Sequence, residues 1–395
     1  MATNIYENLY KKLDDIVLVN SGDDDFEEIL RLIVFHIWIK RNGFLLPKTK
    51  KDYEAILRTI DKQWPGVLKN SETELNLEQI LSCNSILEEF GVGSSDYESI
   101  DALFEYVVSR EKKGSKGQYF TPRYVIDFMT KIVKPTPHES IVDPACGSGA
   151  FLFHSYLQEP NQTWEHLWGF DLDNSAIRIA KLLNYVSSSF RFHLFQVNSL
   201  LQPVQQLNLF SDEKITTIED IARIQKIKPL FDVVLTNPPF AGDTTEEEIL
   251  RTYTLADGKK RIDRDILFIE RCVRLLKPGG RMGIVLPDKV FGNEDCSYVR
   301  QWLISECEIL AVVGLPRNVF MPHTPVKTSI IFLRKRVSKS NRTSDESIIF
   351  GISEKPGKDS RGNPIYKNAI RSWKNVDTDL DEIERALKGL FDKEA

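Results

Sequence analysis

Two patterns of hydrophobic positions divide the chain. From the N-terminus to about residue 113, apolar side chains recur at helical spacing. One series runs from Phe26 to Trp38, follows the acidic residues Asp23 to Asp25 and ends before Gly43. A second series extends from Ile100 to Val108. We therefore predict an all-helical N-terminal domain over residues 1–113, in which packing of the helices accounts for these residues.

Beyond the charged, glycine-bearing linker segment 110–117, short β-branched runs alternate with amphipathic ones. Strands alternating with helices predict an α/β fold with a doubly wound, mostly parallel sheet. We place this catalytic domain at residues 114–340, followed by a C-terminal tail, 341–395, whose amphipathic helix packs on a partner or on its own domain. The predicted helices cover 123–134, 150–156, 175–185 and 265–276; the predicted strands cover 141–142, 167–170, 231–236, 283–286, 309–314 and 328–333.

Composition narrows the classes of protein. The 42% of hydrophobic residues can form a sizeable core, and the five cysteines lack the spacing of metal ligands, so we expect a reducing compartment and no metal. No signal-like or membrane-spanning apolar run is present, which favours a cytoplasmic location without membrane contact. The net charge of -5 is unfavourable for binding nucleic acid, unless basic clusters such as 110–116, 259–264 and 334–342 contact it or a partner holds it.

A glycine-bearing turn suits a nucleoside cofactor. The strand at 141–142 ends in Asp143-Pro144-Ala145-Cys146-Gly147-Ser148-Gly149 and leads into a helix, where glycines admit a ligand and the helix N-terminus attracts an anion. A dinucleotide fingerprint would need a third glycine where Leu152 stands. S-adenosylmethionine, which carries one carboxylate, fits this turn better than a nicotinamide cofactor.

The ends of the neighbouring elements add to this cofactor site. Asp171 follows the next strand, where α/β nucleoside sites hold a ribose, so we assign it to the ribose hydroxyls. Helix capping is a better role for Asp173 or Asn174. Upstream, Thr121 is predicted to cap a helix that begins at Pro122.

The tetrapeptide Asn237-Pro238-Pro239-Phe240 ends a short apolar strand. The two prolines fix the backbone and leave carbonyl groups free. The Asn237 side chain and the Pro238 carbonyl can accept both N–H groups of an adenine amine, while Phe240 stacks on the base. This arrangement favours methyl transfer to the amine by positioning alone, without a metal or a strong general base, on a base flipped out of the duplex.

In this order, the segments 118–122, 143–152, 237–240, 275–280 and 285–287 resemble the N6-adenine DNA methyltransferases. The segments 315–320 and 326–332 are similar to a late-strand signature of the modification subunits of type I restriction-modification systems. The resemblance covers residues 114–335 and implies a Rossmann-like, S-adenosylmethionine-dependent methyltransferase sheet. It implies cofactor contacts from Gln118, Tyr119, Phe120, Thr121, Pro122, Arg123, Asp143, Gly147, Ser148, Gly149, Ala150 and Asp171, and adenine contacts from Asn237, Pro238, Pro239 and Phe240.

Two positions depart from the family's pattern. Asn198 stands where such enzymes often carry an acidic residue near the cofactor's adenine. Because an amide oxygen still accepts a hydrogen bond, we expect altered rather than lost cofactor binding by Asn198. The polar stretch 202–229 is longer than usual and is predicted to be a surface insertion with one helix.

The resemblance implies methyl transfer from S-adenosylmethionine to adenine N6 in double-stranded DNA. Only residues 334–395 follow the last predicted strand, too few for a target-recognition domain. We therefore expect a separate specificity subunit, and a restriction subunit (nuclease or translocase) as a further partner. A protein glutamine N5-methyltransferase shares the Asn-Pro-Pro chemistry, but the long helical N-terminus and the late-strand signature argue against it. The other alternative, a catalytically silent subunit that binds cofactor and DNA, is motivated by Asn198 and the net charge.

Overall fold

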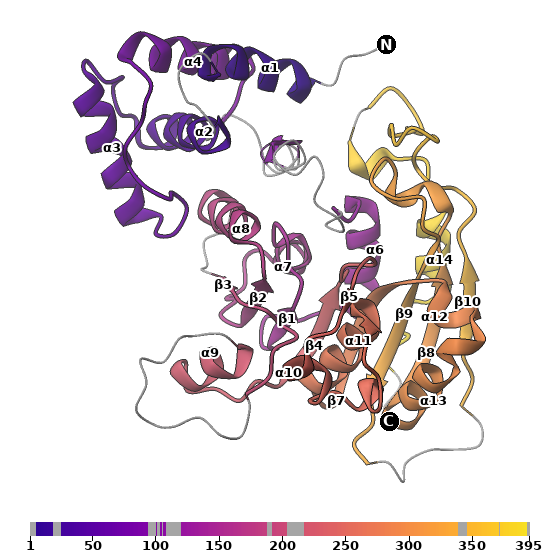
Figure 1. The fold of residues 1–395 in the computed structure, drawn as a ribbon. Coiled ribbons are helices and arrows are strands. Elements are labelled where there is room, and N and C mark those ends of the chain that lie inside the picture. Colours follow the sequence, from indigo (N-terminus) through magenta and orange to yellow (C-terminus); the bar gives the residue numbers. More distant parts are fainter. Residues whose placement is uncertain are drawn as a thin grey trace, which may run out of the picture. The chain divides into compact units, whose positions relative to one another are not determined.

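The computed structural model describes residues 5–18, 25–93, 100, 103–104, 106–107, 120–187, 192–203, 217–338, 346–370 and 372–392 (Figure 1). Val108, the predicted linker 110–117 with its basic cluster, and the candidate cofactor residues Gln118 and Tyr119 lie outside these ranges. The chain forms two compact units. Unit 1 comprises Met1–Ser115 and Asn174–Arg191, and unit 2 comprises Lys116–Asp173 and Phe192–Ala395.

Unit 1 is helical, which confirms the prediction for the described part of the N-terminal region. Its elements are α1 (Ile5–Val17), α2 (Asp25–Asn42), α3 (Lys50–Gln63), α4 (Leu77–Glu89) and α8 (Asn174–Ser187). Helix α2 is buried from Phe26 to Ile39 and forms the centre of this unit. It ends beside Gly43, whose positive φ of 65° stops the helix as the sequence predicts.

The assignment of α8 to unit 1 differs from the domain division expected from the sequence, which placed 114–340 in one catalytic domain. Arg178 in α8 forms a buried bidentate ion pair with Glu27 in α2. The Nε of Arg178 also donates to the Val67 carbonyl at 2.8 Å. Removing one partner of such a pair leaves a buried charge uncompensated, at a cost of about 3–5 kcal/mol. This ion pair therefore fastens α8 to the N-terminal helices.

Unit 2 is built on an eight-stranded sheet in the order β10-β8-β9-β7-β4-β1-β2-β3. Neighbouring strands are parallel, except that β9 runs antiparallel to both β7 and β8. The α/β class and the mostly parallel sheet are thus confirmed. The strands are β1 (Ile141–Asp143), β2 (Leu167–Asp171), β3 (His193–Gln196), β4 (Phe231–Thr236), β7 (Leu276–Pro287), β8 (Cys307–Gly314), β9 (Thr328–Lys335) and β10 (Ile349–Ile352).

The helices and short elements of unit 2 surround this sheet, and the insertion at 202–229 contains one helix in its described part, as predicted. The elements are α6 (Arg123–Val133), α7 (Ala150–Tyr156), α9 (Ile218–Ile224), the strand pair β5 (Asp243–Thr244) and β6 (Ile262–Asp263), α10 (Glu247–Leu250), α11 (Arg264–Leu275), α12 (Lys289–Gly292), α13 (Ser297–Glu306) and α14 (Leu380–Ala386). The 3-10 turns are Thr254–Ala256, Glu294–Cys296, Arg317–Phe320 and Trp373–Asn375.

The C-terminal region is part of unit 2 rather than a separate tail. Its strand β10, which the sequence analysis missed, pairs with β8 at the edge of the sheet. Its helix α14 packs against α6, and Ile383 lies 3.4 Å from the position that a Cβ on Gly351 of β10 would take. The predicted amphipathic helix therefore packs on its own unit.

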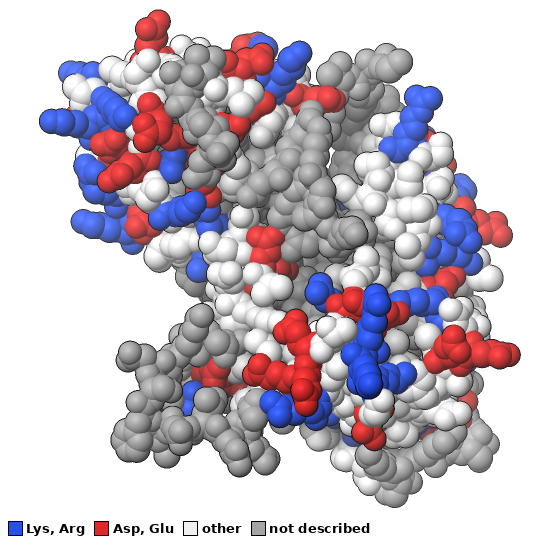
Figure 2. All heavy atoms as spheres, viewed as in Figure 1, with Lys and Arg blue, Asp and Glu red and all other residues white. Residues whose placement is uncertain are grey.

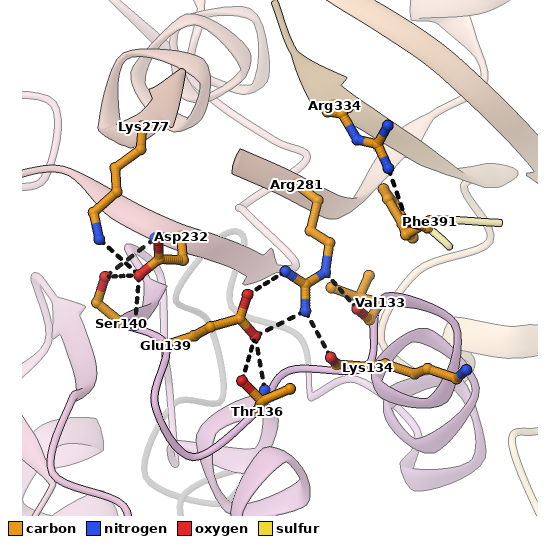
Figure 3. Close-up of polar contacts among 10 residues, drawn as sticks. All are labelled: Val133, Lys134, Thr136, Glu139, Ser140, Asp232, Lys277, Arg281, Arg334 and Phe391. Carbon is orange, nitrogen blue, oxygen red and sulfur yellow. Dashed lines mark hydrogen bonds and ion pairs between the residues drawn. The ribbon is translucent and has the colours of Figure 1, made fainter. Parts of the chain in front are cut away.

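Ion pairs fix the amino ends of the central strands (Figure 3). Lys277 at the start of β7 lies 2.7 Å from the Asp232 carboxylate in β4, and that carboxylate also accepts from the Ser140 hydroxyl at 2.7 Å. Arg281 in β7 pairs with Glu139 and donates from Nε to the α6 carbonyl of Val133 at 2.6 Å. Lys277, which lies in the segment 275–280 of the family resemblance, therefore joins β7 to β4 at the amino ends of the strands.

Candidate active site at the carboxyl ends of the strands

The carboxyl ends of β1, β2 and β4 lie side by side in the sheet. Asp143 at the end of β1 pairs in register with Gly169 of β2, and Val142 pairs with Val234 of β4. The Thr236 hydroxyl donates to Asp143 Oδ1 at 2.6 Å, and the Ala145 N–H donates to the same oxygen at 3.0 Å. Asp143 therefore braces the strand that carries the glycine turn against the strand that carries the tetrapeptide.

This brace changes the acidity of the carboxyl group. Burial raises the pKa of Asp143 from its ordinary value of 3.8 to about 7, and the negative charge of Asp171 acts in the same direction. The hydrogen bonds from Thr236 and Ala145 oppose this rise. With 1% of its surface exposed, the side chain lies beneath the glycine turn. A direct cofactor contact by Asp143 stays a prediction.

Asp171 at the end of β2 holds the glycine turn. Its Oδ2 accepts from the Gly147 N–H at 2.9 Å, and its Oδ1 accepts from the Asp173 N–H at 2.9 Å. Gly147 and Gly149 have positive φ angles of 51° and 79°, which glycine adopts without strain. A Cβ on Gly147 would meet no atom within 4 Å, so the turn borders open space. A carboxylate and an accessible backbone at the carboxyl ends of neighbouring strands fit a nucleoside cofactor. Of the neighbouring candidates, Ser148 and Ala150 are buried.

Leu152 occupies the position of the missing third glycine. The structure shows how α7 packs on the sheet with a leucine there. A Cβ on Gly169 would come within 2.7 Å of a Leu194 methyl carbon and 3.0 Å of both Cys146 Sγ and a Leu152 methyl carbon. The close approach between α7 and the sheet is thus made possible by a glycine on β2 instead of one on the helix. The chain therefore lacks the third glycine of a dinucleotide fingerprint and still packs α7 closely on the sheet.

Asn198 follows β3 and lies near the glycine turn. Its Oδ1 accepts from the Leu200 N–H at 3.1 Å, and the hydroxyl of Ser199 donates to the Pro144 carbonyl at 2.6 Å. The amide therefore forms a local turn that an asparagine side chain favours. Its predicted contact with the cofactor's adenine stays a prediction.

Asn237 follows β4 directly, and the nitrogen and the oxygen of its side-chain amide have different surroundings. Its Nδ2 donates to Thr121 Oγ1 at 2.8 Å. Its Oδ1 is buried and has no hydrogen-bond partner among the described residues. Pro238 is buried and Pro239 is half-buried. Phe240 meets the fully buried Phe320 edge-on, with ring centroids 5.4 Å apart and an interplanar angle of 88°.

The prediction of Thr121 as a helix cap is wrong. The capping position of α6 belongs to Pro122, without a side-chain hydrogen bond, and the helix starts at Arg123. Thr121 lies one residue too early for its hydroxyl to cap the first turn. Instead, the hydroxyl contacts Asn237. Phe120 and Arg123 are both half-buried at this end of α6.

A basic loop follows the tetrapeptide. We call residues 242–264 the basic loop after its exposed basic cluster, Lys259, Lys260, Arg261 and Arg264. The segment as a whole carries six acidic and five basic residues, so only this cluster is basic. The pairing of β5 with β6 closes it, and Glu270 of α11 anchors it by accepting the N–H groups of Thr254 and Leu255 at 2.8 and 2.7 Å.

Two of the basic side chains in the basic loop already have a contact within the protein. Arg261 pairs with Asp243, and Lys259 Nζ lies 4.0 Å from the centroid of the Tyr298 ring. On the face drawn in Figure 2, basic and acidic side chains of the described residues are interspersed.

The later basic cluster, 334–342, is used within unit 2 as far as it is described. Arg334 donates to the Phe391 carbonyl at 2.9 Å, Lys335 to the Leu276 carbonyl at 2.8 Å, and Arg336 forms an ion pair with Glu346 at 2.6 Å. These contacts join the end of β9 to its surroundings. This cluster is therefore a structural element of unit 2.

Three expected absences concern the described residues only. They contain no group of three or more His, Cys, Asp or Glu side chains placed to hold a metal ion. None of their helices is long and apolar enough to cross a membrane. Cys83, Cys146, Cys272, Cys296 and Cys307 are buried and form no disulfide.

Comparison with known proteins identifies the class of this chain. Residues 96–378 match the family model described as N-6 DNA Methylase. The chain belongs to the N-6 DNA methylase family.

Relatives of the chain include methylase subunits of type I restriction enzymes. The chain is 30% identical over 236 residues to the type I restriction enzyme EcoEI methylase subunit of Escherichia coli, covering 57% of this chain and 44% of that protein. It is 22% identical over 372 residues to the type I restriction enzyme MpnII methylase subunit of Mycoplasma pneumoniae, covering 88% and 63%. The chain thus spans less than two thirds of these curated relatives.

Solved structures share the fold. A modification subunit of a putative type I restriction enzyme from Vibrio vulnificus superposes with a TM-score of 0.63 at 18% identity, covering 99% of this chain and 90% of that one. A putative class I S-adenosylmethionine-dependent methyltransferase from Listeria monocytogenes gives a TM-score of 0.57 at 19% identity, covering 98% and 99%. These likenesses confirm the methyltransferase sheet that the sequence analysis predicted.

Proposed function

We propose that this chain is the modification subunit of a type I restriction-modification system and transfers a methyl group from S-adenosylmethionine to adenine N6 in double-stranded DNA. The observation that carries this proposal is the buried Oδ1 of Asn237, which has no hydrogen-bond partner among the described residues and follows the strand next to the one that leads into the glycine turn held by Asp171. A buried acceptor without a partner costs about 1–3 kcal/mol, so a ligand donor is expected to satisfy it. The family, N-6 DNA methylases, supports an amine as that donor.

The residues at the strand ends divide the task. Bound S-adenosylmethionine supplies an electrophilic sulfonium methyl group. Asp171 accepts hydrogen bonds from the ribose hydroxyls. The turn at Gly147 to Ala150, Phe120 to Arg123 and the two residues outside the described ranges, Gln118 and Tyr119, enclose the methionine part. Asn198 lies toward the cofactor's adenine.

The tetrapeptide then orients the substrate amine. The lone pair of the adenine amine is delocalised into the ring, which makes it a weak nucleophile. Asn237 Oδ1 and the Pro238 carbonyl would accept hydrogen bonds from its two N–H groups and favour a pyramidal nitrogen with a localised lone pair. Pro239 keeps the backbone rigid and Phe240 supplies an aromatic face for the flipped base. The methylated amine loses its proton to water, so positioning accounts for the catalysis.

A specificity subunit is the main proposed partner, and a restriction subunit is a further one. The net charge of -5 and the interspersed charges support a partner that holds the duplex. Within this chain, the basic loop that follows Phe240 is the proposed contact with DNA phosphates. A reaction on genomic DNA places the enzyme in the cytoplasm.

One experiment separates this function from its alternatives. The chain is purified together with its specificity partner, and methyl transfer from labelled S-adenosylmethionine to unmethylated DNA is followed by nucleoside analysis. We expect label in N6-methyladenine, and none with Asn237→Ala. Label in protein glutamine instead would favour the glutamine methyltransferase. Cofactor and DNA binding without transfer would favour the silent subunit.

A further inference from the structure

The contact between Thr121 and Asn237 joins residues that lie 116 positions apart in the sequence. Thr121 precedes α6 and Asn237 follows β4, so the contact links two separate elements of unit 2. The Thr121 hydroxyl does not cap α6, which leaves it available as an acceptor for Asn237 Nδ2. Thr121 therefore has a defined partner at the site of the proposed methyl transfer.

The orientation of the Asn237 amide decides what it offers to a substrate. The terminal torsion of an asparagine is broad and roughly two-fold, so the amide can present either its oxygen or its nitrogen. A presented NH2 group would face the N–H groups of the adenine amine, donor against donor. A presented oxygen accepts from them. In this structure Nδ2 donates to Thr121, and no described residue donates to Oδ1.

We propose that Thr121 is a positioning residue, which holds the Asn237 amide so that its Oδ1 receives the substrate amine. This inference rests on the proposed function and changes one assignment within it, because the family resemblance places Thr121 among the cofactor ligands. A hydroxyl that acts through Asn237 affects the methyl-transfer step. A hydroxyl that binds the cofactor affects the affinity for S-adenosylmethionine.

Three variants separate these roles. Thr121→Val removes the hydroxyl at nearly constant volume, and Thr121→Ser keeps the hydroxyl. Thr130→Val is the matched control, since the Thr130 hydroxyl is also part of unit 2 but donates to the Ile126 carbonyl within α6 at 2.7 Å. Each variant is prepared in complex with the specificity partner.

For Thr121→Val, we expect the single-turnover methylation rate to fall about 10- to 100-fold, because small errors in position cost that much. The dissociation constant for S-adenosylmethionine, measured by calorimetry, should stay within about twofold of the unmodified protein. Thr121→Ser should recover most of the rate. Thr130→Val should lower only the unfolding temperature.

Several outcomes would overturn the inference. A normal methylation rate in Thr121→Val would do so, as would weaker cofactor binding with an unchanged rate. A neutron diffraction structure of Thr121→Val, which distinguishes the amide oxygen from the NH2 group, gives a readout that does not depend on activity. An unchanged Asn237 amide would show that Thr121 does not orient it. Failure of the proposed function appears differently, as absence of N6-methyladenine with the unmodified complex.

Discussion

Thr236 and Asp143, 93 positions apart in the sequence, are joined by a 2.6 Å hydrogen bond in which the hydroxyl donates to a buried carboxyl. This bond connects the ends of β4 and β1, the two strands that lead into Asn237 and into the glycine turn. The distance between the proposed amine acceptor and the cofactor loop therefore depends on it. The same bond involves a group that titrates near neutral pH.

The first prediction concerns the stability of the protein as a function of pH. Because burial raises the pKa of Asp143 to about 7, the folded state keeps this proton between about pH 4 and 7 whereas the unfolded state loses it. The contribution of this group to stability is therefore complete below about pH 4 and is lost as the pH rises through 7.

Asp143→Asn should remove that dependence, since its amide oxygen can still accept from Thr236 and Ala145. Urea unfolding at pH 4.5 and pH 8 measures it. When the pH rises from 4.5 to 8, the free energy of unfolding of the unmodified protein should fall by on the order of 2–4 kcal/mol more than that of the variant. Parallel changes in both proteins would contradict the raised pKa.

The second prediction separates two roles in the site. Asn237→Ala should abolish methyl transfer and leave the affinity for S-adenosylmethionine nearly unchanged. Asp171→Asn should first weaken cofactor binding, about 10-fold or more, because the ribose hydroxyls and the Gly147 N–H lose a charged acceptor. Calorimetry and single-turnover kinetics measure both. An equal loss of cofactor affinity in the two variants would contradict this division.

The third prediction concerns DNA binding by the basic loop. Lys260 and Arg264 have no acidic partner among the ion pairs of the described residues, whereas Arg261 pairs with Asp243. Changing both to Gln should reduce the slope of log K against log salt for DNA binding by about 2, if each contacts one phosphate.

The control for the basic loop is Arg385→Gln with Lys388→Gln, which removes two exposed charges from the C-terminal region. These two substitutions leave the charges of the basic loop unchanged. Equal slopes for both double variants and the unmodified complex would exclude the basic loop from the DNA contact.

The fourth prediction concerns the packing of α7. Gly169→Ala places a methyl group within 3.0 Å of Leu152, Leu194 and Cys146, so the free energy of unfolding should fall by about 1–3 kcal/mol. Leu152→Ala by itself leaves a cavity and costs about 2–5 kcal/mol. Because it also makes room for the new methyl group, the double variant should lose less stability than the sum of the two single losses, which denaturant unfolding of all three variants measures. Additive losses in the double variant would show that Leu152 is not the limiting contact.

Local pattern was sufficient for some elements and insufficient for others. The apolar run of β4 and the glycine-preceded helix α7 were predicted with their observed bounds, because burial and turn chemistry are encoded within each segment. The edge strand β10 was missed, since its exposed residues Phe350 and Ile352 do not alternate with polar ones. The antiparallel direction of β9 depends on chain connections and not on its own residues.

Within the site, the residue types were predictable and their partners were not. The Asn-Pro-Pro-Phe segment indicates an amine site by its chemistry alone. Thr121, however, carried a strong local signal for a helix cap, and a tertiary contact with Asn237 took precedence. Likewise, Gly169 gave no signal of its role, because the need for glycine there arises from Leu194, Cys146 and Leu152, which lie on other segments of the chain. Such pairings are set by the fold.

Helix α8 has a consequence for how this protein can be cut or recombined. The chain passes between the two units three times, after Ser115, after Asp173 and after Arg191. A truncation that begins near residue 116 would thus delete α2 and leave Arg178 without Glu27. A chimera that exchanges the N-terminal helices with those of a relative should carry α8 along with them. The smallest transferable piece of unit 1 is discontinuous, and its second part starts three residues after Asp171.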